Sequence, residues 1–302
     1  MLLVGNGRLI TRDEAFPYAE DGAVALDGEV IKEVGALSEL RAKYPDAEFV
    51  DARGGVIMPG LINVHTHIYS GLARGLSIDG FNPTNFLEVL DGQWWYIDRH
   101  LTLDGTRACA YATVLDCIRD GVTTIFDHHA SFCEIPGSLF AIKDVCQELG
   151  IRANLCYEVS ERDGAEKCGQ AIRENADFAR WAKEQDDDMI KAMFGGHALF
   201  TISDKTFDRM VAANNGRTGY HIRRVRLPPE LRLPPGEPPA LQRRAGGKDH
   251  AGPLHPHLPR RDGHSQGDGH HGVPQPGIQH GQRGGLLAGA PAVPEGHPHR
   301  PG

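Results

Sequence analysis

The last 80 residues of this 302-residue chain, 223–302, contain no Phe, Tyr, Trp, Met, Cys or Asn. The same segment holds 15 of the 20 prolines, 15 of the 37 glycines and 9 of the 16 histidines. A segment of this composition cannot bury enough apolar surface to offset the conformational entropy that is lost on ordering. The composition therefore excludes one uniform globule and predicts a disordered tail behind a globular part of about 220 residues.

Other features are also missing. No apolar run reaches the roughly 18 residues that a membrane helix needs, and the first residues lack the basic region of a secretory signal. The six cysteines form no CxxC pair, which is typical of reduced thiols in a cytoplasmic protein. Residues 1–222 carry a net charge of −13 and the tail carries +5. The acidic body argues against a nucleic-acid partner, so we expect a cytoplasmic protein that binds neither nucleic acid nor membrane.

Two patterns divide the globular part. Residues 1–56 are predicted to form a small β-sandwich-like part, because apolar runs at 23–26 and 30–34 flank the turn pair Asp27-Gly28. Residues 57–222 alternate short apolar runs with helical patterns. The runs lie at 60–64, 122–126, 151–156, 190–194 and 219–222, and the helical patterns lie near 103–119, 137–149, 164–183 and 204–214. This alternation predicts an α/β fold with about five βα units around a parallel sheet.

The most specific local pattern is PGLINVHTH at residues 59–67, in which an apolar run ends in two histidines. Residues i and i+2 of a strand point to the same face, so His65 and His67 project together. Two adjacent imidazoles suit a zinc-type ion, although the same spacing also occurs as two ordinary polar residues. Their place at the end of a strand in an alternating α/β segment favours a metal site.

Histidines also end two further apolar runs. Asp127-His128-His129 ends the second run, and His197 ends the fourth. In a barrel these strand ends meet at one rim, where binding sites are built, whereas each histidine alone is also compatible with a loop residue bonded to backbone. The segment 94–96, Trp-Trp-Tyr, follows a helical stretch and is predicted to pack in the core.

Three segments together resemble the amidohydrolase superfamily. They are PGLINVHTH at 59–67, GVTTIFDHHAS at 121–131 and FGGHALFTISD at 194–204. The likeness is to the SsnA-type aminohydrolases, near the chlorohydrolase and guanine-deaminase-like enzymes, and it covers residues 1 to about 222. It implies a distorted (β/α)8 barrel, here partial, with a small β-domain. It also implies a hydrolase of C–N bonds in small amino-heterocycle-like substrates, with one divalent metal ion, zinc or alternatively iron, and is compatible with a homodimer.

The same resemblance assigns roles to residues. It implies His65 and His67 as metal ligands and His197 as a substrate-pocket residue, and we place His129 beside it from its strand-end position. A further ligand and a proton-carrying Glu are expected on the fifth strand in a His-x-His-x-x-Glu pattern. Here Arg223 stands at the ligand position and Arg226 at the Glu position. No catalytic residue is therefore retained, and the chain as it stands is expected to be inactive.

The tail is compatible with a frameshifted reading of the same gene. When synonymous codons are chosen to fit, the codons of three tail segments can be read one base out of frame. The codons of residues 277–288 then encode ESNMGNAVGCSP, those of 247–257 encode EKTMLGHCIHI, and those of 295–301 encode KGIRIGL. All three resemble segments of the family. We therefore divide the chain into a β part at 1–56, an incomplete barrel at 57–222 and a frameshift-derived tail at 223–302. The alternatives are a non-catalytic His-rich metal-binding protein and a regulatory fragment that pairs with intact barrels.

Overall fold

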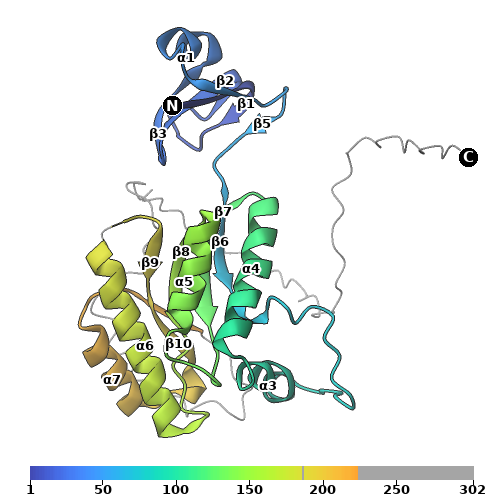
Figure 1. Ribbon diagram of the computed structural model, residues 1–302, viewed down its shortest axis with the longest axis vertical. Coiled ribbons are helices and arrows are strands. Elements are labelled where there is room, and N and C mark those ends of the chain that lie inside the picture. Colours follow the sequence, from blue (N-terminus) through green and yellow to red (C-terminus); the bar gives the residue numbers. More distant parts are fainter. Residues whose placement is uncertain (186, 224–302) are drawn as a thin grey trace, which may run out of the picture. The chain divides into compact units, whose positions relative to one another are not determined.

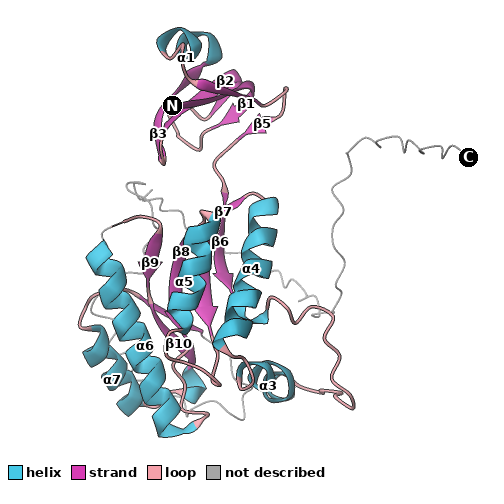
Figure 2. Ribbon diagram, viewed as in Figure 1, coloured by secondary structure: helices cyan, strands magenta, loops and turns pink. Residues whose placement is uncertain are grey.

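The computed structural model describes residues 1–185 and 187–223 (Figure 1). The expected disordered tail, apart from Arg223, lies outside the described residues. Within them the fold is α/β, with an N-terminal sheet and a second, parallel sheet flanked by helices (Figure 2). The predicted fold class is thereby confirmed.

The N-terminal strands form one five-stranded sheet. They are β1 (Leu2–Ile10), β2 (Tyr18–Asp27), β3 (Val30–Ala36), β4 (Glu48–Asp51) and β5 (Val56–Ile57), accompanied by helix α1 (Leu37–Lys43). The order is β3-β2-β1-β4, with β5 also paired to β1. Strands β2 and β3 are antiparallel and meet at the predicted turn, where Gly28 has a φ of +59° that favours glycine. Leu3, Ala23, Ala25 and Leu40 form the small core of this sheet.

The remaining strands are parallel and form a four-stranded and a two-stranded sheet. Strands β6 (Leu61–Thr66), β7 (Val122–His129), β8 (Arg152–Tyr157) and β9 (Ile190–Ala192) pair in the order β6-β7-β8-β9, and β10 (Phe194–Ala198) pairs with β11 (Tyr220–Arg223). Within each of these two sheets every strand neighbours the next one along the chain, which is the arrangement of strands in a (β/α) barrel. The five predicted runs are therefore confirmed, with the fourth divided into β9 and β10 at Met193.

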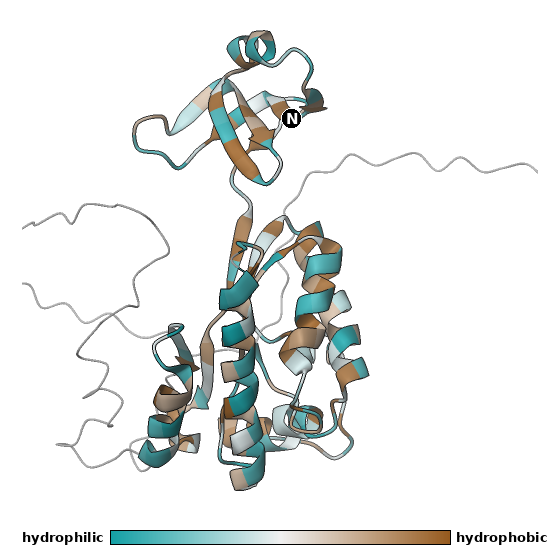
Figure 3. Cartoon of the chain, turned by 60° about the vertical axis from the view of Figure 1, so that its left-hand side comes forward, coloured by the Kyte–Doolittle hydropathy of each residue, from teal (hydrophilic) through white to brown (hydrophobic). Residues whose placement is uncertain are grey.

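Helices follow these strands and lie along one face of the sheet (Figure 1). They are α4 (Leu103–Arg119), α5 (Ser138–Leu149), α6 (Gly164–Gln185) and α7 (Asp204–Asn214), all close to the predicted positions. Figure 3 shows them with mixed hydrophilic and hydrophobic residues, as expected for helices with one side on a sheet. Among the described helices, none has the length and apolar character needed to cross a membrane.

The segment between β6 and α4 contains several short elements, where the sequence indicates only a helical stretch before residue 94. They are η1 (Ile68–Ser70), α2 (Phe86–Val89), η2 (Leu90–Trp94) and α3 (Trp95–Asp98), and a further short turn, η3 (Leu199–Thr201), follows β10. None is longer than 5 residues. Elements this short show little helical period in the sequence, so their bounds could not be predicted.

A buried amide on α6 joins β8 to β10. The Oδ1 of Asn175 accepts hydrogen bonds from the backbone N–H groups of Tyr157 and Gly195, each at 3.0 Å. Its Nδ2 donates to the Tyr157 carbonyl oxygen at 2.8 Å. Position 195 must be glycine, because a Cβ there would lie 2.3 Å from the same carbonyl oxygen. The amide therefore sets the close approach of two strands whose carboxyl ends carry polar residues.

Replacing this amide is expected to destabilise the fold strongly. In Asn175→Leu, three buried backbone groups of β8 and β10 lose their partner, and since each costs about 1–3 kcal/mol, we expect the free energy of unfolding to fall by about 3 kcal/mol or more. Urea unfolding followed by circular dichroism measures this loss. Arg180→Leu, at an exposed position of the same helix, is the control and should change stability by less than about 0.5 kcal/mol. Equal losses in the two variants would contradict the role of the amide.

Candidate metal centre

Four histidines and one carboxylate meet at the carboxyl ends of the parallel strands. His65 and His67 come from the end of β6, His128 from β7 and His221 from β11, while Glu158 directly follows β8. The closest ring pairs have centroids 4.7–6.0 Å apart. Parallel strands bring their carboxyl ends to one rim, and this is why residues spread over more than 150 positions gather there.

The histidine pair lies together as its spacing predicts. The rings of His65 and His67 are 4.8 Å apart and nearly perpendicular. The Nδ1 of His67 lies 2.7 Å from the carbonyl oxygen of His128, and the Nδ1 of His65 lies 3.0 Å from the Nε2 of His221. With its proton on Nδ1, His67 donates to that carbonyl and keeps a lone pair on Nε2. A backbone carbonyl that fixes the tautomer in this way is the usual support of a metal-binding histidine.

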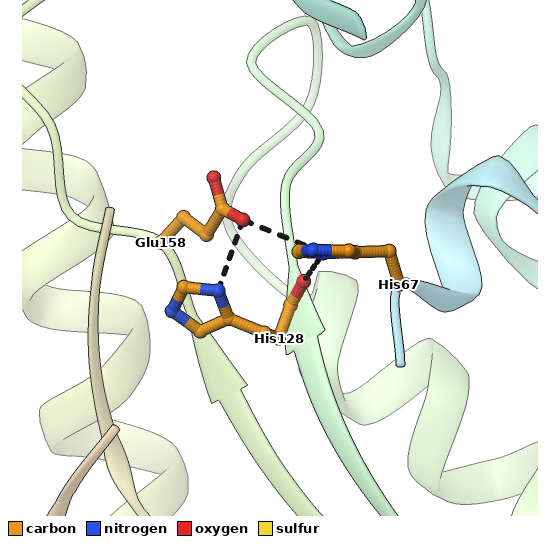
Figure 4. Close-up of side chains that lie close together, drawn as sticks. All are labelled: His67, His128 and Glu158. Carbon is orange, nitrogen blue, oxygen red and sulfur yellow. Dashed lines mark hydrogen bonds and ion pairs between the residues drawn. The ribbon is translucent and has the colours of Figure 1, made fainter. Parts of the chain in front are cut away.

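Glu158 stands at the centre of the cluster, although it was not among the residues predicted from the sequence. Its Oε1 lies 3.0 Å from His128 Nδ1 and 3.5 Å from His67 Nδ1 (Figure 4), and its Oε2 lies 3.7 Å from His197 Nε2. Burial opposes its ionisation, but His128, His197 and His67 outweigh burial and hold the pKa of Glu158 well below its usual range. The available signal was its position after the third apolar run, which is the criterion that singled out the histidines.

His128 is fully buried, and its chemistry fits a metal ion. Among the described residues, its Nε2 has no hydrogen-bond partner. Buried polar atoms are nearly always paired, so an orphaned imidazole nitrogen indicates a missing ligand. His67, His128 and Glu158 each offer one donor atom, and these atoms lie within 4.8 Å of one another. Two imidazoles and a carboxylate form a donor set that zinc accepts and that also suits Fe(II).

His197 lines a small, partly open cavity beside this cluster. The cavity is lined by His67, Tyr69, Ser70, Leu90, Trp94, Trp95, Glu158 and His197. The ring of His197 stands 5.9 Å from that of Trp95, and its Nδ1 lies 3.0 Å from Thr201 Oγ1. The prediction that residues 94–96 pack in the core is wrong in part. Trp94 contacts the core but also lines the cavity with Trp95, and Tyr96 is exposed.

A buried ion pair holds the tryptophan wall in place. The guanidinium of Arg162, in the loop after β8, donates two hydrogen bonds to the carboxylate of Asp98 at the end of α3. The same guanidinium lies 5.0 Å from the ring centroid of Trp95 and 4.0 Å from that of Phe132. The loop that carries Glu158 and the short helix that carries Trp95 are thereby linked. The tryptophan wall of the cavity is thereby tied to the loop that follows β8.

His129 lies outside the cavity lining. It is fully buried, with its Nε2 at 3.0 Å from Ser131 Oγ and its ring 5.6 Å and 6.2 Å from those of Tyr157 and Tyr69. Burial lowers the pKa of His129 to about 3, which keeps the ring neutral. The structure therefore brings His65, His67 and His197 to the rim and packs His129 behind it.

The fifth strand reaches the rim with only part of its expected pattern. His221 is half-buried, and burial followed by the neighbouring His128 lowers its pKa to about 4. Arg223 pairs through its backbone with Ala198 of β10, so the position belongs to the sheet. Arg226 lies beyond the described part of the chain.

Comparison with known proteins gives consistent matches. A family model described as amidohydrolase family matches residues 56–222, and one described as imidazolonepropionase-like composite domain of bacteria matches residues 22–47. The 5'-deoxyadenosine deaminase of Methanosarcina barkeri is 29% identical over 231 residues, which are 76% of this chain and 50% of that protein. The 5-methylthioadenosine/S-adenosylhomocysteine deaminase of Thermococcus onnurineus is 30% identical over 204 residues, which are 67% of this chain and 44% of that protein. The chain spans about half the length of the curated relatives it matches.

Solved structures share the fold. Atrazine chlorohydrolase from Arthrobacter aurescens, complexed with zinc, superposes with a TM-score of 0.59 at 22% identity and covers 74% of this chain and 52% of its own. Guanine deaminase from C. acetobutylicum, with bound guanine, gives a TM-score of 0.61 at 15% identity over 73% of this chain and 52% of its own. At these identities the likeness supports the architecture, a barrel of which this chain supplies part.

Proposed function

This chain belongs to the amidohydrolase family, and from that premise we propose that it is the first half of a metal-dependent aminohydrolase. The observation that carries the proposal is the meeting of His65, His67, His128 and Glu158 at the strand ends. Relatives named as deaminases of 5'-deoxyadenosine and of 5-methylthioadenosine support a purine-like amino-heterocycle as the substrate.

The residues present would hold the ion at the rim. The pair His65 and His67, with His128 and Glu158 beside it, supplies nitrogen and oxygen donors, which favour zinc and admit iron. When bound, such an ion supplies Lewis-acid activation of water for attack on a C–N carbon. Part of the coordination of the ion would thus come from the strand ends that this chain contains.

The cavity next to the cluster would bind the heterocycle. Trp95 offers a flat apolar wall, and the buried carboxylate of Glu158 accepts a hydrogen bond from an N–H or amino group. His197 lines the same cavity and would orient the ring by a hydrogen bond from its imidazole. This combination of an apolar wall and few polar groups is typical of small-molecule sites.

The chain as it stands would not turn over substrate. Arg223 occupies the position of a metal ligand and Arg226 that of the proton carrier. A guanidinium has no lone pair to give to a metal and stays protonated at neutral pH, so it cannot accept the proton either. We therefore propose that this chain retains part of a metal site and has lost catalysis.

Zinc binding by the purified chain tests the proposed site. Titration against a chromophoric chelator should show one zinc per chain with a Kd of about 10⁻⁶ M, in keeping with an incomplete ligand set. His67→Ala should weaken binding at least about tenfold. His100→Ala removes an exposed histidine outside the cluster and should have no effect.

Two other results would contradict the proposal. Equal zinc affinity in His67→Ala and His100→Ala would show that the strand-end cluster binds no metal. Loss of binding in a His270→Ala, His271→Ala double variant, with His67→Ala unaffected, would favour the non-catalytic His-rich metal-binding protein instead.

A further inference from the structure

We propose that the open edge of β6 pairs with β6 of a second copy of this chain, in antiparallel orientation, and so forms a dimer. Among the described strands, β6 pairs only with β7, and its other edge has no neighbouring strand. The inference goes beyond the proposed function and does not depend on it, because it rests on the exposed side chains of β6 and not on a metal ion.

The apolar side chains of β6 are exposed, unlike those of the strands that follow it. Leu61, Ile62 and Val64 are 49%, 57% and 70% exposed. In contrast, β7 has one exposed residue, Thr123, and β8 has none. Strands of a parallel sheet are normally covered on both faces, and an exposed apolar patch on a folded protein marks a surface that another molecule covers. The exposure of β6 therefore indicates an interaction surface.

The strand also lacks the features that protect most edge strands from pairing. Residues 60–66 contain no Lys, Arg, Asp, Glu or Pro, and the nearest such residue is Pro59, which precedes the strand. Charged side chains and proline within an edge strand oppose the addition of another strand. Strand β11, which pairs only with β10 among the described strands, does end in a charged residue, Arg223. Strand β6 is therefore the edge that favours pairing.

The charge distribution favours a second copy as the partner. Residues 56–68 contain no acidic or basic side chain other than histidine, so a strongly charged partner would find no complementary charge there. Residues 1–222 carry a net charge of −13, and two copies therefore repel each other over most of their surface. At β6 this repulsion has no local source. A neutral, apolar strand is the complement of this edge, and β6 of a second copy is such a strand.

A two-fold axis through Asn63 makes the edge complementary to itself. In an antiparallel pair about this axis, Ile62 lies opposite Val64 of the second copy, and Val64 lies opposite Ile62. Residues two apart in a strand share a face, so these four side chains form one apolar cluster across the axis. Asn63 lies opposite its own copy, and its amide can both donate and accept a hydrogen bond. Because each copy uses the same edge, the assembly closes at two chains.

Sedimentation equilibrium of the full chain tests the dimer and its register. We expect a wild-type dimer with a Kd of about 10⁻⁵ M, in keeping with a small interface. Ile62→Lys and Val64→Glu each place charges in the apolar cluster and should each weaken the dimer at least about tenfold. The double variant sets opposite charges against each other across the axis, and should dimerise at least about fivefold more tightly than either single variant. Val211→Lys, at a 41% exposed position of α7, is the control and should match wild type.

Each other outcome would overturn the inference. A wild type that stays monomeric at about ten times the expected Kd would assign this edge to a different partner, such as a strand of an intact barrel. Equal affinity in wild type and both single variants would place the contact elsewhere, and a double variant no tighter than the single variants would exclude the Asn63 register. Assemblies larger than two chains would exclude the two-fold contact.

Two controls keep these outcomes clear. Far-ultraviolet circular dichroism identifies any variant that fails to fold, and Ile62→Arg or Val64→Asp then replaces it with the same sign of charge. The measurements are repeated with a metal chelator, in which the dimer should persist unchanged. A dimer that persists while the chain binds no zinc would contradict the proposed function alone, whereas a monomer that binds zinc would contradict this inference alone.

Discussion

A chain whose reading frame is restored after Ile222 and extended to the last barrel strand is expected to release ammonia from amino-purines or related heterocycles at least about 10⁴-fold faster than the present chain. Two changes produce this gain. From the resemblance to the family, the restored fifth strand is expected to supply a histidine ligand and a glutamate at the positions of Arg223 and Arg226. The added strands also close the barrel, which needs eight of them, around the rim that holds His65 and His67.

Ammonia release from a panel of amino-purines, amino-pyrimidines and amino-triazines measures this gain. Activity should disappear after chelation of the metal and in a His65→Ala variant of the restored protein. The present chain, assayed at the same concentration with added zinc, is the matched control. A restored protein that binds one metal per chain and yet hydrolyses nothing in the panel would show that the reaction class is wrong.

Arg223→His in the present chain is expected to tighten zinc binding at least about tenfold. The backbone of residue 223 pairs with Ala198 at the rim, so the new imidazole enters the strand that already carries His221. The substitution also makes the net charge of the chain more negative, which favours binding of a divalent cation. The measurement is the same chelator competition that gives the wild-type affinity.

A charge-matched control separates the two effects of that substitution. Arg217→His also exchanges a guanidinium for an imidazole, but its side chain hydrogen-bonds to backbone carbonyl oxygens at the end of α7. If both variants tighten zinc binding equally, net charge explains the gain. If only Arg223→His does so, position 223 is a ligand position.

Much of the fold could be predicted because its signals are local. The runs at 122–126 and 151–156 are short and apolar since strands β7 and β8 are covered by helices, and α6 shows a clear helical period. The division of the fourth strand could not be predicted, because it depends on pairing: β9 bonds to β8, whereas β10 bonds to β11. Register is a property of neighbouring strands rather than of one segment.

Only part of the candidate site could be predicted from the sequence. His65 and His67 carry a signal within three residues, and strand periodicity alone places them together. Glu158 is a single carboxylate in a chain with 40 Asp and Glu residues, and its position directly after the third apolar run is its one local signal. Its significance comes from its burial and from its two histidine neighbours. Only folding brings Glu158 Oε1 to 3.0 Å from His128 Nδ1 and to 3.5 Å from His67 Nδ1. Trp95 was misjudged for the same reason, since a buried core and a cavity wall select similar residues.

The nucleotide sequence from codon 216 to beyond codon 302 tests most directly whether this chain is the first half of a metal-dependent aminohydrolase whose second half is read out of frame. We predict that a neighbouring frame encodes a His-x-His-x-x-Glu pattern near codon 221, the motifs GHC and ESNMGNAVGCSP within the tail, and an aspartate on a last barrel strand beyond codon 302. A coding sequence in which no neighbouring frame contains these motifs would contradict the account and leave the His-rich tail as a genuine part of the protein.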